Sequence, residues 1–220
     1  MQQKELVKLE LLEIRQEDAV NGVEEVQLLT NAGTIPCLYH VVSNSAAAVL
    51  WVFGSRGGLD GPAGGMYKRL SEELAGCEIA SLRLDYRKPG HLIDCVLDVL
   101  LGIGFLRSRG HRRITLVGYS FGGAVVINAA VSSPAVAAVA ALSSQLQGAD
   151  DIAELSPRPV LLLHGSSDRV RSEIGSRQLY DLAGDPKDLL VYEGCGHNLD
   201  ECREQVDKDL FEWLRRVTIP

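Results

Sequence analysis

The sequence predicts an α/β fold, in which a mostly parallel sheet of eight strands carries helices on both faces and begins with an antiparallel hairpin. Short apolar runs rich in β-branched residues recur along the 220 residues, and from the middle of the chain they alternate with segments of helical periodicity. Strands that are apolar throughout are typical of a parallel sheet buried on both faces. Hydrophobic residues make up 46% of the chain, which is enough for one sizeable core, so one domain spanning 1–220 is expected.

The first half of the chain predicts four strands and two helices. Residues 1–20 are an uncertain extension, because the first fifteen or so fit either a strand or a helix. The runs 23–30 and 34–42 flank Asn31, Ala32 and Gly33 as a hairpin would. The other expected elements are a buried strand at 47–54 that ends in a glycine-rich loop, a helix at 65–76 with Gly76 as its C-cap, a strand at 77–86 and a helix at 91–109.

The second half repeats the alternation of strand and helix. A strand at 112–120 leads directly into a helix at 121–133, which stops before Pro134. The remaining expected elements are strands at 135–144, 158–168 and 187–196, a helix at 172–184 and an amphipathic helix at 202–216. Neither an internal repeat nor a low-complexity linker interrupts this order.

Charge and composition exclude several classes of function. The net charge of −7 argues against nucleic acid or an anionic membrane as the main partner, since both favour a basic surface. The N-terminus has no apolar signal-peptide core, and no stretch approaches the roughly 18 apolar residues of a membrane span, so a cytoplasmic protein is expected. The five cysteines are odd in number and lack a CxxC spacing, which predicts reduced thiols, most of them small core residues.

The segment GYSFG, residues 118–122, matches the GxSxG pattern of a nucleophile elbow. It lies where that motif must lie, between a predicted strand and a predicted helix. A sharp turn there would lift the hydroxyl of Ser120 clear of the sheet, and Gly118 and Gly122 would leave room for it. The alternative interpretation is a tight structural turn that happens to contain a serine.

A serine hydroxyl is a weak nucleophile at neutral pH, so the elbow predicts a histidine base and a carboxylate, in the chain order Ser, Asp or Glu, His. Asp168 follows one predicted strand and His197 follows the last one. Open α/β sheets gather their sites at the carboxyl ends of the strands, where both residues fall. Asp150 or Asp151 is the alternative acid, and Asp168 is favoured because its strand ends more abruptly.

With these motifs the chain resembles the α/β-hydrolase superfamily from about Val23 to the C-terminal helix, and within it the dienelactone hydrolases and carboxylesterases with a small cap or none. In that superfamily the nucleophile, acid and histidine usually follow the fifth, seventh and eighth strands, where GYSFGG, HGSSD and GCGHN fall. The resemblance implies that Ser120 is the nucleophile, Asp168 the acid and His197 the general base.

The resemblance also implies an oxyanion hole made by two backbone N–H groups. One follows the nucleophile, which here is the N–H of Phe121, and the other comes from the loop after the third predicted strand. That loop reads FGSRGG, with Phe53 and Gly54 in place of the usual His-Gly. By position its donor is the N–H of Ser55, with Arg56 as the next candidate.

Other residues near the predicted site have weaker claims. Arg56 and Arg169 each adjoin a predicted site residue and could hold a substrate carboxylate, although a solvated loop arginine is the ordinary alternative. His164 is expected to support the turn that carries Asp168, and Cys195 is expected to pack in the core. The remaining histidines lie away from the strand ends, no spacing indicates a metal site, and no cofactor is implied.

The predicted function is that of a serine hydrolase, which cleaves small carboxylic esters or thioesters through an acyl-enzyme on Ser120. Only residues 145–158 separate the sixth and seventh predicted strands, which is too short for a cap domain, so the site should be shallow and open to small acyl groups. The alternatives are a non-catalytic binding protein on the same fold, or a peptidase, lyase or perhydrolase. The expected partner is a small molecule, and the sequence predicts no oligomeric state.

Overall fold

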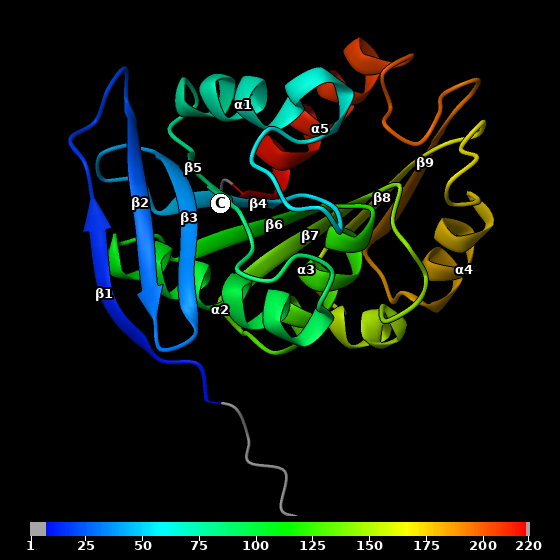
Figure 1. Ribbon diagram of the computed structural model, residues 1–220. Helices are drawn as coiled ribbons and strands as arrows, with labels where there is room; N and C mark the ends of the chain where they lie inside the picture. The colour runs from blue at the N-terminus through cyan, green and yellow to red at the C-terminus, as the bar shows by residue number, and fades with distance from the viewer. Residues whose placement is uncertain (1–7, 219–220) are drawn as a thin grey trace, which may run out of the picture.

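A nine-stranded sheet forms the centre of the protein, as seen in a computed structural model that describes residues 8–218 (Figure 1). Its strand order is β1-β2-β3-β5-β4-β6-β7-β8-β9. The strands are β1 (Leu11–Gln16), β2 (Val23–Thr30), β3 (Gly33–His40), β4 (Ala47–Val52), β5 (Ala80–Leu84), β6 (Arg113–Tyr119), β7 (Val136–Leu142), β8 (Val160–Gly165) and β9 (Lys187–Tyr192). Strands β4 to β9 run parallel and β1 to β3 pair antiparallel, which confirms the predicted α/β fold.

Helices cover both faces of the sheet, as expected for buried parallel strands. They are α1 (Pro62–Ala75), α2 (Leu92–Ser108), α3 (Phe121–Val131), α4 (Ile174–Leu182), α5 (Arg203–Thr218) and the short 3₁₀ helix η1 (Asp150–Leu155). Helices α1 and α5 lie together on one face, and α2, α3 and α4 lie on the other (Figure 1). None of the helices within residues 8–218 is long and apolar enough to cross a membrane.

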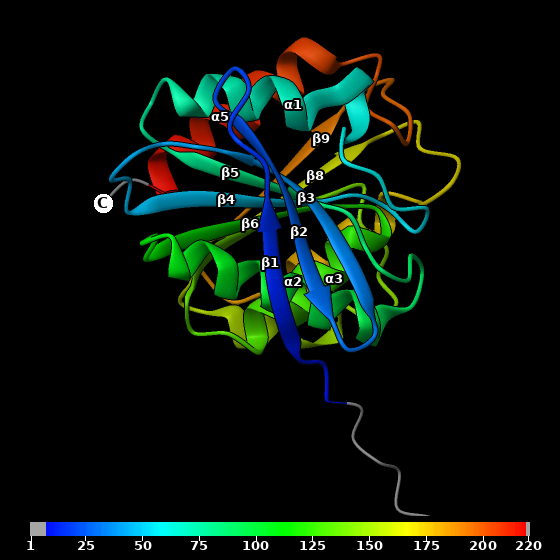
Figure 2. The same ribbon diagram turned by 60° about the vertical axis from the view of Figure 1, so that its left-hand side comes forward.

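Strand β1 accounts for the difference between eight predicted strands and nine observed ones. It pairs antiparallel with β2 at the edge of the sheet, and Figure 2 shows β1, β2 and β3 side by side at this end. All six of its residues are exposed, so no alternation of buried and exposed positions marked it as a strand. The Asn31 side chain fastens the start of this segment, accepting from the Glu10 amide at 3.1 Å. Residues 1–7 of the uncertain extension lie outside the described residues.

Helix α1 begins earlier than the predicted 65–76 and in an unusual conformation. Ala63, Gly64 and Gly65 all have positive φ, at 50°, 61° and 88°, and the regular helix follows them. The Arg69 guanidinium donates to the carbonyls of Gly64 and Ala63 at 2.6 and 2.7 Å, and pairs with Asp207 of α5 at 2.7 Å. This arginine therefore joins the glycine-rich start of α1 to the C-terminal helix.

The prediction of five reduced cysteines is wrong for one pair. Cys195 and Cys202 form a disulfide with Cα atoms 5.8 Å apart, because the loop after β9 folds back on itself and brings together two residues with no recognisable motif spacing. Cys195 is buried, as expected, but it packs as half of this cross-link. Cys37, Cys77 and Cys95 are free thiols, and burial raises the pKa of Cys95 to about 12.

Candidate active site

The turn between β6 and α3 has the strained geometry that a nucleophile elbow requires. Ser120 has a φ of 54° and a ψ of −114°, a conformation that residues with a side chain rarely adopt. A Cβ on Gly118 would overlap the carbonyl of Gly122, and a Cβ on Gly122 would overlap the carbonyl of Phe53. Both glycines are therefore needed for the close approach of strand, loop and helix at this turn.

The structure brings Ser120, His197 and Asp168 into one hydrogen-bonded chain. His197 Nε2 lies 3.1 Å from Ser120 Oγ, and His197 Nδ1 lies 2.6 Å from Asp168 Oδ2. Because a carboxylate only accepts, Nδ1 carries the hydrogen and Nε2 is the acceptor for the serine hydroxyl. The alternative acids, Asp150 and Asp151, lie in η1, and within residues 8–218 the carboxylate that hydrogen-bonds to His197 is that of Asp168.

The Asp168 carboxylate is buried and fully hydrogen-bonded. Its Oδ1 accepts from the amides of Val170 and Arg171, both at 2.8 Å, and its Oδ2 accepts from His197 and from His164. Burial by itself would raise the pKa of Asp168, but the two amides and the His197 ring outweigh it and lower that pKa. The carboxyl is therefore ionised at neutral pH and orients the imidazole of His197.

The loop that carries His197 is held from two sides. Ser143 Oγ donates to the His197 carbonyl at 2.9 Å, and the Tyr119 ring packs against the His197 ring with centroids 5.1 Å apart. Tyr119 Oη donates to Asn198 Oδ1 at 2.7 Å. Burial, together with the charge of Asp168, raises the pKa of Tyr119, which keeps this hydroxyl protonated as a donor.

The two amides expected to form an oxyanion hole are both available. Phe121 is the first residue of α3, where N–H groups have no partner within the helix, and Ser55 is exposed in the loop after β4. A Cβ on Gly54 would lie 3.7 Å from the Cβ of Ser120, so this loop touches the elbow. Within residues 8–218, neither the Ser55 nor the Phe121 amide donates a hydrogen bond. Both are free to bind an anionic oxygen.

The arginines near the site differ in their contacts. Arg56 and Arg169 are exposed, and neither side chain makes a hydrogen bond or ion pair with another residue of the described chain. Arg171, which sequence reasoning did not single out, has Nη2 3.5 Å from Gln145 Oε1. Its position three residues after Asp168 was the only available signal.

A hollow of about 330 Å³ lies between the loop after β7 and the start of α4. Leu146, Val170 and Ile174 supply its apolar lining, and the last two are 67% and 60% exposed. The backbone N–H of Gln145, on the same rim, donates to the Ser120 carbonyl at 3.3 Å. The hollow therefore adjoins both the elbow and the Asp168 turn.

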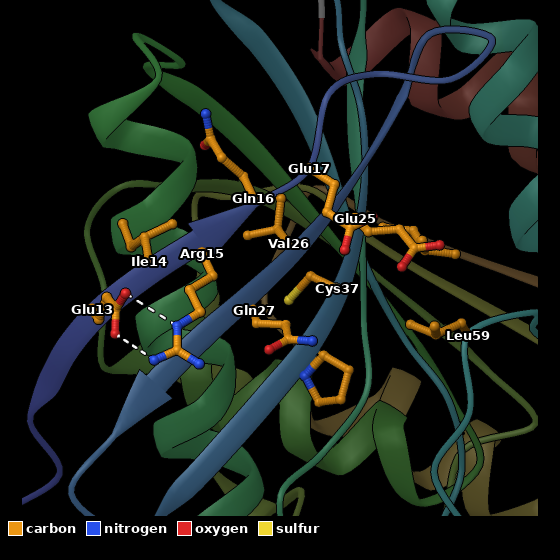
Figure 3. Close-up of a pocket in the computed structure, with 12 residues that line it drawn as sticks. Glu13, Ile14, Arg15, Gln16, Glu17, Glu25, Val26, Gln27, Cys37 and Leu59 are labelled. Atoms are coloured by element: carbon orange, nitrogen blue, oxygen red, sulfur yellow. Dashed lines mark hydrogen bonds and ion pairs between the residues drawn. The ribbon is translucent and has the colours of Figure 1, made fainter.

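A larger hollow of about 770 Å³ lies elsewhere, on the sheet formed by β1, β2 and β3 (Figure 3). Half of its lining residues are charged or amide-bearing, and Figure 3 shows Arg15 paired with Glu13 at its rim. Leu59 is its only lining residue outside this N-terminal segment, and it contains no member of the hydrogen-bonded chain. In residues 8–218 no group of three or more His, Cys, Asp or Glu side chains is placed to share a metal ion.

Comparison with known proteins identifies the family of this chain. Residues 88–209 match the family model for the dienelactone hydrolase family, which is more than half of the chain. An uncharacterized protein of Pseudomonas aeruginosa is 46% identical over 66 residues, a match that covers 30% of this chain and only 15% of that protein.

Solved structures extend the similarity to most of the chain. A dienelactone hydrolase from Anabaena variabilis superposes with a TM-score of 0.75 at 16% identity, covering 94% of this chain and 99% of that one. Est1E from Butyrivibrio proteoclasticus gives 0.73 at 17% identity, covering 92% and 98%. A cold-adapted esterase from an Arctic intertidal metagenomic library gives 0.74 at 18% identity, covering 94% and 100%. At these identities the superpositions show a shared fold.

Proposed function

This chain belongs to the dienelactone hydrolase family of α/β-fold hydrolases, and from that premise we propose that it is a serine hydrolase of small carboxylic esters or thioesters. The observation that carries the proposal is the unbroken hydrogen-bonded chain from Ser120 Oγ through the His197 ring to the Asp168 carboxylate. Its geometry supports activation of the hydroxyl at neutral pH, which is the step that a serine cannot make alone.

The proposed reaction runs through an acyl-enzyme. His197 Nε2 takes the proton of Ser120 as Oγ attacks the ester carbonyl, and the amides of Ser55 and Phe121 bind the resulting oxyanion. His197 returns the proton to the leaving alcohol or thiol. Water then attacks the acyl group with the same base, which releases the acid and restores Ser120. Each amide of such a hole typically contributes about 3 kcal/mol to transition-state stabilisation.

The surroundings of the site support a small substrate. The connection from β7 to β8 contains only η1, so no cap domain covers Ser120 from this side. The hollow lined by Leu146, Val170 and Ile174 has room for a short apolar acyl or alkoxy group. The structural neighbours named as a dienelactone hydrolase and as esterases favour esters over amides for this chain.

Labelling with a fluorophosphonate tests the proposal. The wild-type protein should form a covalent adduct on Ser120 and hydrolyse p-nitrophenyl acetate, and Ser120→Ala should lose both properties. Ser132→Ala, which changes an exposed serine at the other end of α3, is the matched control and should label fully. Equal labelling of wild type and Ser120→Ala, or no labelling of either, would contradict the proposal.

A further inference from the structure

His164, near the end of β8, makes hydrogen bonds through both ring nitrogens although its side chain is completely buried. Its Nε2 lies 3.0 Å from Asp168 Oδ2 and also 3.0 Å from the Arg171 carbonyl. Its Nδ1 lies 2.7 Å from Ser176 Oγ, a buried hydroxyl on α4. The chain of hydrogen bonds that starts at Ser120 therefore continues past Asp168 into the core.

The direction of these hydrogen bonds follows from the partners. A carboxylate and a carbonyl can only accept, so Nε2 of His164 carries a hydrogen and donates to both. Ser176 can donate or accept, so it satisfies Nδ1 of His164 in either state of that nitrogen. Oδ2 of Asp168 consequently accepts from two histidines at once, His164 at 3.0 Å and His197 at 2.6 Å.

We propose that His164 is a positioning residue for the reaction, which fixes the Asp168 carboxylate and limits the basicity that Oδ2 presents to His197, while Ser176 fixes the His164 ring. The inference rests on the proposed function, because it assigns His164 a part in the same proton transfer. A purely structural histidine in β8 would affect folding and leave the pH dependence of catalysis unchanged.

Because His164 and His197 both donate to Asp168 Oδ2, the loss of His164 should shift the pH dependence of catalysis in one direction. An N–H donor withdraws electron density from a carboxylate, so loss of His164 makes Oδ2 a stronger acceptor for the proton on His197 Nδ1. The imidazolium of His197 is then stabilised and the base loses its proton at higher pH. The other groups that face this pair are the amides of Val170 and Arg171 after β8, the Ser120 hydroxyl and the Tyr119 ring on β6, none of which the substitution replaces.

The test compares two substitutions at one position by the pH profile of kcat/KM with p-nitrophenyl acetate. His164→Phe keeps a flat ring and removes the hydrogen bonds to Asp168, Arg171 and Ser176. The acidic limb of its profile should move up by about one pH unit, and its kcat should fall about tenfold or more. His164→Gln can place an amide N–H near the position of Nε2, and should restore the wild-type limb and most of kcat.

Three results would overturn the inference. One is an acidic limb at the wild-type pH in a His164→Phe protein that unfolds cooperatively. Another is an acidic limb of His164→Gln that is displaced as far as that of His164→Phe. If His164→Phe does not fold, Ser176→Ala is the deciding variant, because it frees the His164 ring without removing it. A displaced acidic limb or a shifted low-field proton resonance of His197 then supports the role of His164. An unchanged pH profile with an unchanged resonance refutes it. Failure of the proposed function is distinct, since the wild-type protein itself would then not label or turn over.

Discussion

At the scale of single residues, the site depends on two glycines as much as on its reactive side chains. Gly118 and Gly122 each face a backbone carbonyl that any Cβ would strike. Backbone atoms cannot swing away as the end of a flexible side chain can, so the whole turn would have to move. The turn also holds Ser120 at positive φ, and a shift would relax the conformation that exposes its hydroxyl.

Gly122→Ala should therefore abolish hydrolysis and destabilise the fold by about 3 kcal/mol or more, since its new Cβ overlaps the Phe53 carbonyl. Urea unfolding and ester turnover measure the two effects. Gly104→Ala is the control, because Gly104 is exposed within α2 with nothing within 4 Å of a new Cβ. That variant should gain up to about 1 kcal/mol and keep full activity. Equal stability of the two variants would refute the steric account.

Individual residues also show what the sequence could predict about the site. Ser120, Asp168 and His197 follow strands in a known order, so the topology of a parallel sheet brings them to one edge. The second hydrogen bond to Asp168 Oδ2 was not predictable in its geometry, because a spacing of four residues between His164 and Asp168 does not say how the turn after β8 folds back. The pairing of Cys195 with a partner seven residues away depended on a loop conformation in the same way.

At the scale of elements, the loop from Cys195 to Cys202 carries His197, the proposed general base. The disulfide joins its two ends, and His197 lies between them. A cross-link that closes a loop of about eight residues stabilises the fold by roughly 2 kcal/mol, because it restricts the conformations of the unfolded chain. In the folded protein it also limits how far the loop can move away from Ser120.

Cys202→Ser should lower the free energy of unfolding by about 2 kcal/mol and reduce kcat more than it changes KM, because the base becomes mobile while the substrate hollow is untouched. The matched control is Cys77→Ser, at a free and partly exposed thiol, which should leave both quantities unchanged. Thermal unfolding and steady-state kinetics, with and without a reductant, provide the readout. A wild-type protein whose stability and kcat do not respond to reduction would contradict the assigned role of the cross-link.

A contact between β3 and β5, away from the candidate site, makes the stability of the fold depend on pH. Arg83 Nε of β5 donates to His40 Nε2 of β3 at 3.1 Å, and His40 is buried. Burial, followed by the charge of Arg83, lowers the pKa of His40 to about 4. Between that value and the ordinary one near 6.5, the unfolded chain binds a proton that the folded protein does not, so stability falls as the pH drops through this range.

His40→Gln should remove this part of the acid sensitivity, since an amide oxygen can still accept from Arg83 but does not titrate. We expect the wild-type protein to lose about 2 kcal/mol more than the variant between pH 7 and pH 5. Denaturant unfolding at the two pH values measures the difference. The sign is decisive, because a variant that loses more stability than the wild type would refute a neutral buried His40.

Elements could not be predicted from the sequence where burial leaves no pattern of apolar residues. Helices α2 to α5 and strands β2 to β9 were predictable from their apolar residues, because each buries a face or its whole surface in the core. Strand β1 is exposed throughout and could be recognised only through its partner β2. The start of α1 depends on the positive φ values of Ala63 to Gly65, and alanine gives no warning of such a conformation.

At the scale of the whole molecule, the loops after β4, β6, β7, β8 and β9 meet at the carboxyl ends of the parallel strands. They supply every group of the proposed mechanism. Both faces of the sheet are covered by helices, so these strand ends are where polar groups can gather without disrupting the core (Figure 1). No inserted domain stands between β7 and β8 to enclose a long substrate.

Short p-nitrophenyl esters should therefore be the best substrates, with kcat/KM falling about tenfold or more from butanoate to dodecanoate, since a hollow of about 330 Å³ cannot bury a long chain. Val170→Asp, on the exposed rim of the hollow, should reduce turnover of butanoate more than of acetate. Better hydrolysis of dodecanoate than of butanoate would contradict an open, shallow site.

The order of the site residues along the chain has a consequence for biosynthesis. Strand β6, which leads into the proposed nucleophile Ser120, ends at residue 119. The proposed general base, His197, comes much later, and helix α5, which covers the sheet beside α1, follows it. Ser120 is therefore synthesised 77 residues before His197. Any shortened product that stops before α5 carries the complete elbow motif but lacks Trp213 and Leu214, so the apolar face of the sheet that α5 covers would stay exposed.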